Sequence, residues 1–159
     1  MNYRAKKVFT KLEARGLTLG SVESMTAGMF GAVFTEIPGA SKIYRGGIIV
    51  YSTDLKKDLL KVDPKIIEDK GVVSQQVAIE MVLKARSLLK TDIIISVTGN
   101  AGPDVEPGGE EVGRVCIGLY YNGYTWGIPL QLKGDREEIR RQAVDSMLSF
   151  IESLFPDEE

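Results

Sequence analysis

The sequence contains no histidine and only one cysteine, Cys116. Without histidine a Ser-His-Asp triad is excluded, so the base of any hydrolytic reaction must be a lysine, a tyrosine or a carboxylate. A single cysteine excludes an internal disulfide and is typical of the reducing cytoplasm, where we expect the protein to be located. Zinc, haem and copper sites are also not expected, and we predict neither a metal nor a cofactor.

Long apolar runs and a strong charge of either sign are missing as well. No run approaches the roughly 20 residues of a membrane-spanning helix, and residues 1–12 lack the apolar core of a signal peptide. The net charge of -2 gives no general attraction to nucleic acid or to membranes, so we expect neither as a partner. The 159 residues are enough for one domain, spanning 1–159, with a substantial core.

Hydrophobic periodicity, punctuated by glycine and proline, predicts helices and strands along the whole chain. Helices are expected at residues 3–13, 26–36, 54–60, from 64 onward, 74–89 and 135–154. Strands are expected at residues 17–23, 43–51, 93–97, 115–121 and 124–132, the last two joined by the hairpin turn Asn122-Gly123. Early alternation followed by a late hairpin predicts an α/β fold, a three-layer α/β/α sandwich with a mixed β-sheet.

A run of small and hydroxylated residues, 21–28, joins the first strand to the next helix. Two interpretations fit Ser24 in this turn. It is either a helix cap or a nucleophile beside backbone N–H groups, as an anion or acyl-transfer site requires. Because Ser21 and Thr26 are each able to cap the helix, Ser24 is left without an obvious structural task.

Tyr51 and Lys56 follow the second strand. Their side chains are placed to converge at the strand's carboxyl end, the edge at which open α/β sheets bind ligands. A lysine acts as a base only if its pKa falls, for which burial is one cause. The alternative is an exposed Lys56 beside Lys57 on a solvated helix face.

Three further segments contain candidate binding residues. Gly46-Gly47 inside a strand indicates a bulge or a close backbone approach. The run from Thr98 to Pro103 follows a buried strand, and its glycines either admit a ligand to the backbone or form a simple loop. Arg136 and Arg140 share a helix face and either clamp a phosphate or carboxylate or form surface ion pairs with Glu137 and Glu138.

The order of these motifs along the chain resembles the CinA C-terminal domain family, whose characterised members are nicotinamide mononucleotide amidohydrolases. The motifs that carry the resemblance are Glu23-Ser24-Met25-Thr26-Ala27-Gly28, Pro38-Gly39-Ala40-Ser41, Gly46-Gly47, Tyr51-Ser52 with Lys56, Gly71-Val72-Val73-Ser74, Thr98-Gly99-Asn100-Ala101-Gly102-Pro103, Val112-Gly113 and Gly134-Asp135-Arg136. The resemblance covers residues 3–155. We expect the N-terminal partner domain of longer relatives to be absent here.

This resemblance implies an activity and a set of site residues. The implied reaction hydrolyses the carboxamide of nicotinamide mononucleotide to nicotinate mononucleotide and ammonia, with a serine nucleophile and a lysine or tyrosine base. The implied catalytic residues are Ser24, Tyr51 and Lys56. The implied substrate-binding residues are Thr26, Ala27, Gly28, Gly47, Thr98, Gly99, Ala101, Gly102 and Arg136. The implied assembly is a homo-oligomer, a dimer or larger. Trp126 itself is either a packing residue or a contact in such an assembly.

The sequence departs from the family's motifs at Met25, Ala27 and Asn100. Ala27 places a Cβ where the backbone approaches a ligand or takes a positive φ, and Met25 adds bulk beside the nucleophile. Two alternatives therefore stay open beside the amidohydrolase. One is a nucleotide-binding module without catalysis, and the other is an amidase for a different small amide.

Overall fold

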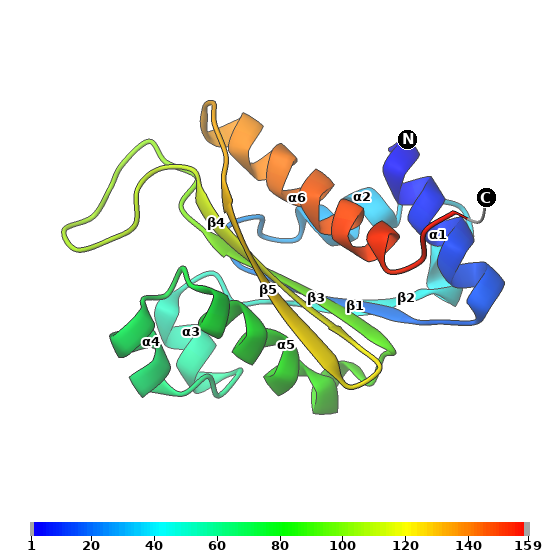
Figure 1. Ribbon diagram of the computed structural model, residues 1–159, viewed down its shortest axis with the longest axis horizontal. Coiled ribbons are helices and arrows are strands. Elements are labelled where there is room, and N and C mark those ends of the chain that lie inside the picture. Colours follow the sequence, from blue (N-terminus) through cyan, green and yellow to red (C-terminus); the bar gives the residue numbers. More distant parts are fainter. Residues whose placement is uncertain (1, 158–159) are drawn as a thin grey trace.

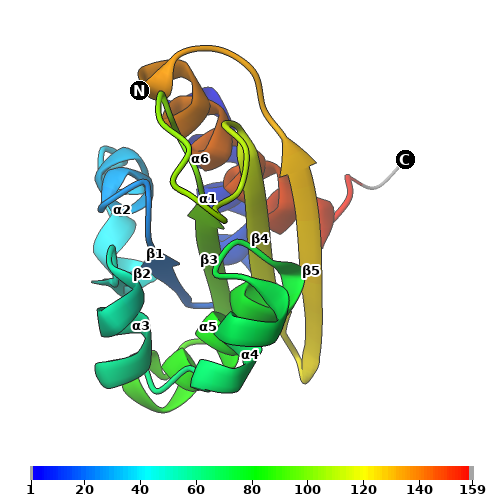
Figure 2. The ribbon, with the colours of Figure 1, turned by 90° about the vertical axis from the view of Figure 1, so that its left-hand side faces the viewer.

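The computed structural model describes residues 2–157, which form a five-stranded sheet in the order β2-β1-β3-β4-β5. The strands are β1 (Leu19–Glu23), β2 (Tyr44–Ile49), β3 (Ile93–Gly99), β4 (Arg114–Tyr121) and β5 (Tyr124–Gln131). β1 pairs in parallel with both β2 and β3, whereas β3, β4 and β5 pair antiparallel. The sheet is therefore mixed, as predicted, and Figure 2 shows its strands side by side from β2 to β5.

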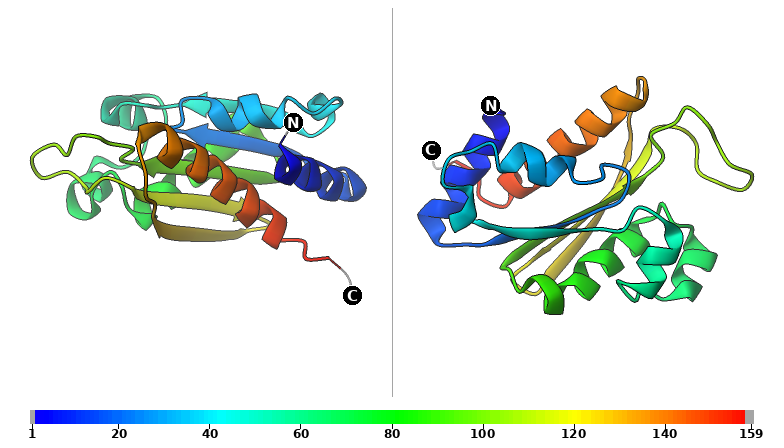
Figure 3. Two further views of the ribbon diagram at one scale, coloured as in Figure 1. Left: turned by 90° about the horizontal axis from the view of Figure 1, so that it is seen from above. Right: turned by 180° about the vertical axis from the view of Figure 1, so that it is seen from behind.

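Helices cover both faces of the sheet, which confirms the three-layer sandwich (Figure 1). On one face lie α1 (Tyr3–Arg15), α2 (Met29–Phe34) and α6 (Arg136–Ser153), seen from above in Figure 3. On the other lie α3 (Thr53–Asp58), α4 (Pro64–Lys70) and α5 (Gln75–Leu89). A short 3-10 turn, η1 (Ala40–Lys42), precedes β2. Among residues 2–157 there is no helix with the length and apolarity needed to cross a bilayer.

β3 is buried on both faces, as its continuous apolar run predicts. Ile93, Ile95 and Val97 belong to the core under α1, α2 and α6, and Ile94 belongs to the core under α5. This division follows the alternation of side chains along a strand. β3 is thus held rigidly in the middle of the sheet, and its carboxyl end is a fixed platform for the residues that follow.

Most of the predicted local signals are confirmed. The Ser52 and Ser74 hydroxyls cap α3 and α5, and Asp135 with Glu138 forms the complete capping box of α6. Asn122 and Gly123 have φ values of 51° and 84°, as a type I′ hairpin turn requires. Pro129 lies on the edge strand β5, where its missing N–H disturbs only one neighbour.

The start of α2 differs from the prediction. The helix begins at Met29 rather than at residue 26, because Ala27 and Gly28 have left-handed φ values of 49° and 99°. Neither Ser21 nor Thr26 caps it, so that expectation was wrong. The carboxylate of Glu23 accepts instead, from the N–H groups of Phe30 at 2.9 Å and Gly31 at 3.3 Å.

The glycine pair in β2 marks both a bulge and a close approach. Pairing with β1 shifts between Tyr44 and Gly46, which leaves Arg45 as the extra residue. A Cβ on Gly47 would lie 2.6 Å from the Tyr44 hydroxyl and 2.7 Å from Ser21 Oγ. Those two hydroxyls are themselves hydrogen-bonded at 2.7 Å. Gly47 is therefore required by protein packing, whatever it contributes to a ligand.

Candidate active site

Three parallel strands end at one edge of the sheet and bring the predicted site residues together. Ser24 follows β1, Tyr51 follows β2, and Thr98 lies at the end of β3. Backbone bonds extend the ladder past the strands, from the Ser24 N–H to the Val97 carbonyl at 3.2 Å and from the Val50 N–H to the Glu23 carbonyl at 2.9 Å. This is the edge at which ligands bind in open α/β sheets.

Lys56 of α3 is buried against Ser24, with 1% of its surface exposed. Its Nζ donates to Ser24 Oγ at 2.8 Å, to the Val50 carbonyl at 2.8 Å and to the Tyr51 carbonyl at 3.2 Å. These contacts use all three donors of an ammonium group. The alternative of an exposed lysine on a solvated helix face is therefore wrong.

Burial lowers the pKa of Lys56 from 10.5 to about 8. Its three acceptors are a hydroxyl and two carbonyl oxygens, all uncharged, so no ion pair holds the proton. Removing a lone ammonium from water favours the neutral amine. Close to neutral pH, Lys56 is thus able to lose its proton and accept one from Ser24, with which it is already in contact.

Tyr51 reaches the site through its backbone rather than through its side chain. Its carbonyl accepts from Lys56, and the Ser24 hydroxyl lies 3.4 Å from the same oxygen. The residue as a whole is 55% exposed, and its hydroxyl accepts from Arg136 Nη2 at 3.0 Å. In this geometry the direct Ser24–Lys56 contact is the short route for a proton.

The turn that carries Ser24 keeps some of its N–H groups free. The Ala27 N–H donates to the Ser24 carbonyl and the Met29 N–H to the Thr26 carbonyl, both at 3.0 Å. Within residues 2–157 the N–H groups of Met25, Thr26 and Gly28 have no acceptor. Since Glu23 occupies the N–H groups that begin α2, the available oxyanion donors are those of the turn itself rather than those of the helix.

Both candidate arginines of α6 reach the site. Arg136 donates to the Gly102 carbonyl and the Tyr51 hydroxyl, and Arg140 donates to the Met25 carbonyl at 3.0 Å and the Thr26 carbonyl at 3.1 Å. The alternative of ion pairs with Glu137 and Glu138 is wrong, because Glu137 pairs with Arg141 and Glu138 caps α6. Sequence reasoning missed that Arg140 binds the Ser24 turn, although its four-residue spacing from Arg136 placed both on one face.

The loop after β3 is organised by its own polar side chains. Thr98 is buried, and its hydroxyl donates to the Val72 carbonyl at 3.0 Å. The Asn100 side chain accepts from the Gly102 N–H at 2.9 Å and donates to the carbonyls of Asp104 and Glu110. Asn100 therefore holds the loop closed on itself.

A cavity of about 420 Å³ lies beside this loop. Of the predicted substrate-binding residues, Gly99, Gly102 and Arg136 line it, and Thr26, Ala27, Gly28, Gly47, Thr98 and Ala101 do not. Arg136 is the cationic side chain on its wall, facing a lining that also contains Asp104, Glu106 and Glu110. Arg136 is the predicted binding residue that joins this cavity to the Tyr51 side of the site.

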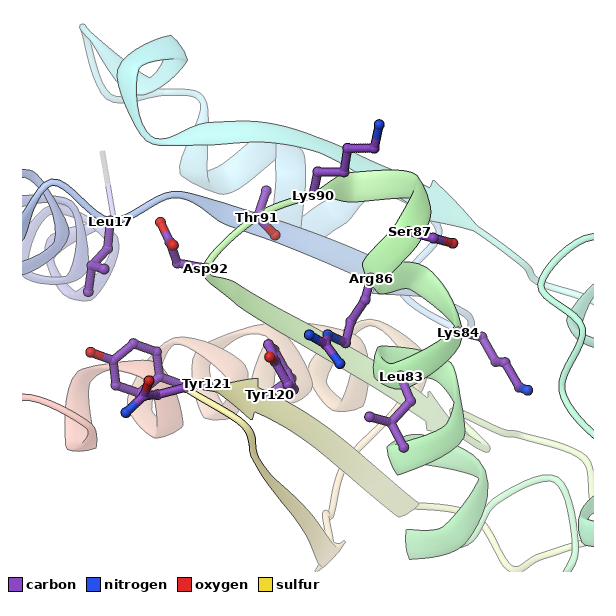
Figure 4. Close-up of a pocket in the computed structure, with 11 residues that line it drawn as sticks. Leu17, Leu83, Lys84, Arg86, Ser87, Lys90, Thr91, Asp92, Tyr120 and Tyr121 are labelled. Carbon is purple, nitrogen blue, oxygen red and sulfur yellow. The ribbon is translucent and has the colours of Figure 1, made fainter.

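A larger cavity, of about 760 Å³, lies at the opposite end of the sheet, near the start of β3 (Figure 4). Arg86 lies over the ring of Tyr120, 4.4 Å from its centroid. Lys84 and Lys90 point away from that ring in Figure 4. The Asp92 carboxylate accepts hydrogen bonds from the N–H and the hydroxyl of Thr18. The charged groups here do not converge on one point.

Residues 2–157 contain no group of three or more acidic or cysteine side chains placed to hold a metal ion.

Ala27→Gly is expected to stabilise the fold, because Ala27 holds a left-handed φ of 49° with its side chain exposed. Relief of that conformation, offset by the greater freedom of glycine in the unfolded chain, amounts to about 0.5–1 kcal/mol. Chemical denaturation measures it. Gly28→Ala is the matched control and should lower the free energy of unfolding, since φ is 99° and the new Cβ would lie 3.2 Å from Ile49 Cδ1. A destabilised Ala27→Gly variant would contradict this account.

Comparison with known proteins places this chain in a family. The profile of the CinA C-terminal domain matches residues 2–155. A competence-damage inducible protein of Halalkalibacterium halodurans is 42% identical over 140 residues, which are 87% of this chain and 33% of that protein. One from Listeria monocytogenes serotype 4a is 42% identical over 148 residues, 92% of this chain and 36% of that protein.

Solved structures agree. The competence or damage-inducible protein of Enterobacter asburiae has a TM-score of 0.93 at 29% identity, covering 96% of both chains. The competence/damage inducible protein CihA of Agrobacterium tumefaciens has a TM-score of 0.90 at 29% identity, covering 96% of this chain and 94% of the other. The chain spans about a third of the length of the curated relatives it matches. The chain belongs to the CinA C-terminal domain family.

Proposed function

We propose that the protein is an amidohydrolase that converts nicotinamide mononucleotide to nicotinate mononucleotide and ammonia. The observation that carries the proposal is the 2.8 Å contact between Ser24 Oγ and the buried Lys56 Nζ. A hydroxyl nucleophile in contact with an amine whose pKa is lowered to about 8 is the pairing that acyl transfer needs when histidine is absent. The resemblance of the motifs to the characterised amidohydrolases supplies the substrate.

In the first half of the reaction, Ser24 Oγ attacks the carboxamide carbon and its proton passes to neutral Lys56. Negative charge develops on the carboxamide oxygen, and the free N–H groups of the Ser24 turn are the donors available to it. The C–N bond then breaks, and Lys56 returns the proton to the departing nitrogen. Ammonia leaves and the nicotinoyl ester of Ser24 remains.

In the second half, a water molecule attacks the ester carbon while Lys56 accepts its proton. The ester bond breaks, and Lys56 gives the proton back to Ser24 Oγ. The products are nicotinate mononucleotide and the free enzyme, so the cycle consumes one water and releases one ammonia. Lys56 thus serves as base and acid in turn, a role that requires a pKa near the working pH.

We propose that Arg136 binds the phosphate of the substrate. It lines the cavity beside the loop after β3, and its present acceptors are the Gly102 carbonyl and the Tyr51 hydroxyl. Both are uncharged, so a phosphate is the stronger acceptor for the same guanidinium.

Arg136→Gln is therefore expected to raise the KM for nicotinamide mononucleotide by about 10–100-fold, the loss of one charge-assisted contact. Turnover of nicotinamide riboside, which has no phosphate, should change far less. The control is Arg141→Gln, one exposed arginine further along α6 that pairs with Glu137. An equal loss of activity on both substrates would show that Arg136 stabilises the loop and does not bind the phosphate.

Ammonia release from nicotinamide mononucleotide by the purified chain tests the proposed function, with nicotinate mononucleotide identified as the second product. Nicotinamide and nicotinamide riboside are run beside it to define which part of the substrate is recognised. Thermal stabilisation by the nucleotide without ammonia release would overturn the proposal in favour of a nucleotide-binding module. Ammonia release from a different amide, with none from the nucleotide, would show that the proposed substrate is wrong and the proposed chemistry is right.

We also propose that the chain self-associates. β5 is an edge strand, and it presents Tyr124 and Trp126, which are 66% and 39% exposed with their rings 6.1 Å apart. An exposed aromatic pair on an unpaired strand edge is a feature typical of contact surfaces. Light scattering of the wild type and of Trp126→Glu measures the assembly state.

A further inference from the structure

We infer that Arg140 is a positioning residue for the reaction, acting on the Ser24 turn through backbone carbonyls. The inference rests on the proposed function, because it assigns Arg140 a part in the same acyl transfer. Arg140 lies one helical turn after Arg136 on α6 and is half-buried. It comes 116 positions after Ser24 in the sequence, so only the packing of α6 on this face brings the two together.

The guanidinium of Arg140 forms hydrogen bonds to two consecutive peptide groups. Nε donates to the Met25 carbonyl at 3.0 Å and Nη2 donates to the Thr26 carbonyl at 3.1 Å. A planar fork with fixed donor directions determines the orientation of both peptides, which a single flexible ammonium does not. The turn that follows the nucleophile is thereby tied to the long helix α6.

These bonds hold the turn that carries the donor a substrate is able to reach. Thr26 is fully buried, so its N–H is not accessible to a substrate oxygen. Gly28 is partly exposed, and its N–H has no acceptor within residues 2–157. It lies two residues beyond the Thr26 carbonyl, on the turn that Arg140 holds. Arg140 therefore fixes the direction in which the Gly28 N–H points.

The turn needs such external support. Ala27 and Gly28 are left-handed at φ 49° and 99°, a conformation that costs free energy at the alanine. From the other side, the Glu23 carboxylate accepts from Thr26 Oγ1 at 2.6 Å. Thr26 is thus held at its side chain by an anion and at its carbonyl by a cation. The two charges fix the peptide groups next to Ser24 before substrate arrives.

The test compares Arg140→Gln and Arg140→Lys with the wild type, and Arg141→Gln is the matched control on the same helix. Arg140→Gln is expected to lower kcat for nicotinamide mononucleotide by about 10–100-fold while KM changes by less than about threefold, as for a weakened oxyanion donor. Arg140→Lys should fall between the two, because it keeps the charge and loses the fork. Arg141→Gln should match the wild type.

Several results would overturn the inference. They are a kcat of Arg140→Gln within about fivefold of the wild type, a loss confined to KM, or an equal loss in Arg141→Gln. If circular dichroism shows that Arg140→Gln is unfolded, Arg140→Lys decides alone. A kcat lowered at least fivefold at unchanged KM supports the inference, and any smaller effect overturns it.

A second readout separates this inference from the proposed function. Phenylmethylsulfonyl fluoride transfers its sulfonyl group to a reactive serine and releases fluoride and a proton, and intact mass records the adduct, with Ser24→Ala as the blank. If the wild type shows no turnover of the nucleotide but Ser24 is labelled, the proposed substrate is wrong. Labelling at least tenfold slower in Arg140→Gln then supports the inference, and labelling at the wild-type rate overturns it. A wild type with neither turnover nor labelling overturns both proposals.

Discussion

Ser24→Ala is expected to lower kcat for nicotinamide mononucleotide by about 10⁴-fold or more, the scale seen when a serine nucleophile is removed. Ser24 Oγ is the hydroxyl that contacts the buried Lys56 amine, at 2.8 Å. Without it there is no acyl-enzyme, and only orientation of the substrate remains. The measurement is ammonia release under saturating substrate, with the variant's fold checked by circular dichroism.

The cost of Ser24→Ala to stability should be small. Lys56 loses one of three acceptors and keeps the carbonyls of Val50 and Tyr51, so the free energy of unfolding should fall by about 1 kcal/mol. Ser74→Ala is the control. It removes the cap of α5, at a similar cost of about 1 kcal/mol, and should leave kcat nearly unchanged. Near wild-type turnover by Ser24→Ala would exclude Ser24 as the nucleophile.

Lys56→Met is expected to abolish measurable turnover, because it removes the proton acceptor beside Ser24. In the wild type, kcat/KM should rise about tenfold per pH unit below pH 8 and level off above it, since only the neutral amine accepts the proton and its pKa is about 8. The profile is measured with nicotinamide mononucleotide from about pH 6 to about pH 10. A rate that is independent of pH across this range would rule out Lys56 as the base.

The same ionisation should appear in the pH dependence of stability. The pKa of Lys56 is about 8 when folded and close to its ordinary 10.5 when unfolded, so between these values the unfolded chain binds more protons. The free energy of unfolding therefore gains from Lys56 as pH rises through this window, by about 3 kcal/mol when complete.

Lys56→Met lacks this titration and supplies the reference for it. The wild type should gain stability relative to Lys56→Met as pH rises from about 7 to about 10, a range that covers most of the interval between the two pKa values of Lys56. Chemical denaturation at three pH values across that window measures the difference. A difference that stays constant with pH would contradict a lowered pKa for Lys56.

Features that depend on neighbours in sequence could be predicted from the chain. The caps at Ser52, Ser74 and Asp135 and the hairpin turn at Asn122 involve partners within a few residues, so the local pattern contains both members of each interaction. The burial of β3 followed from its uninterrupted apolar run. The capping of α2 could not be predicted in this way, because a carboxylate in the preceding strand displaced the nearer hydroxyls.

The order of elements, the mixed α/β layers and the identity of the residues gathered at the carboxyl edge of the sheet could all be predicted from the pattern of residues along the chain. How those residues meet depends on tertiary packing. It buried Lys56 against Ser24, turned the Tyr51 hydroxyl to Arg136 and placed Arg140 on the carbonyls of the Ser24 turn. These contacts join residues 32, 85 and 115 positions apart. Their geometry is set by how strands and helices pack, which no pattern within a few residues records.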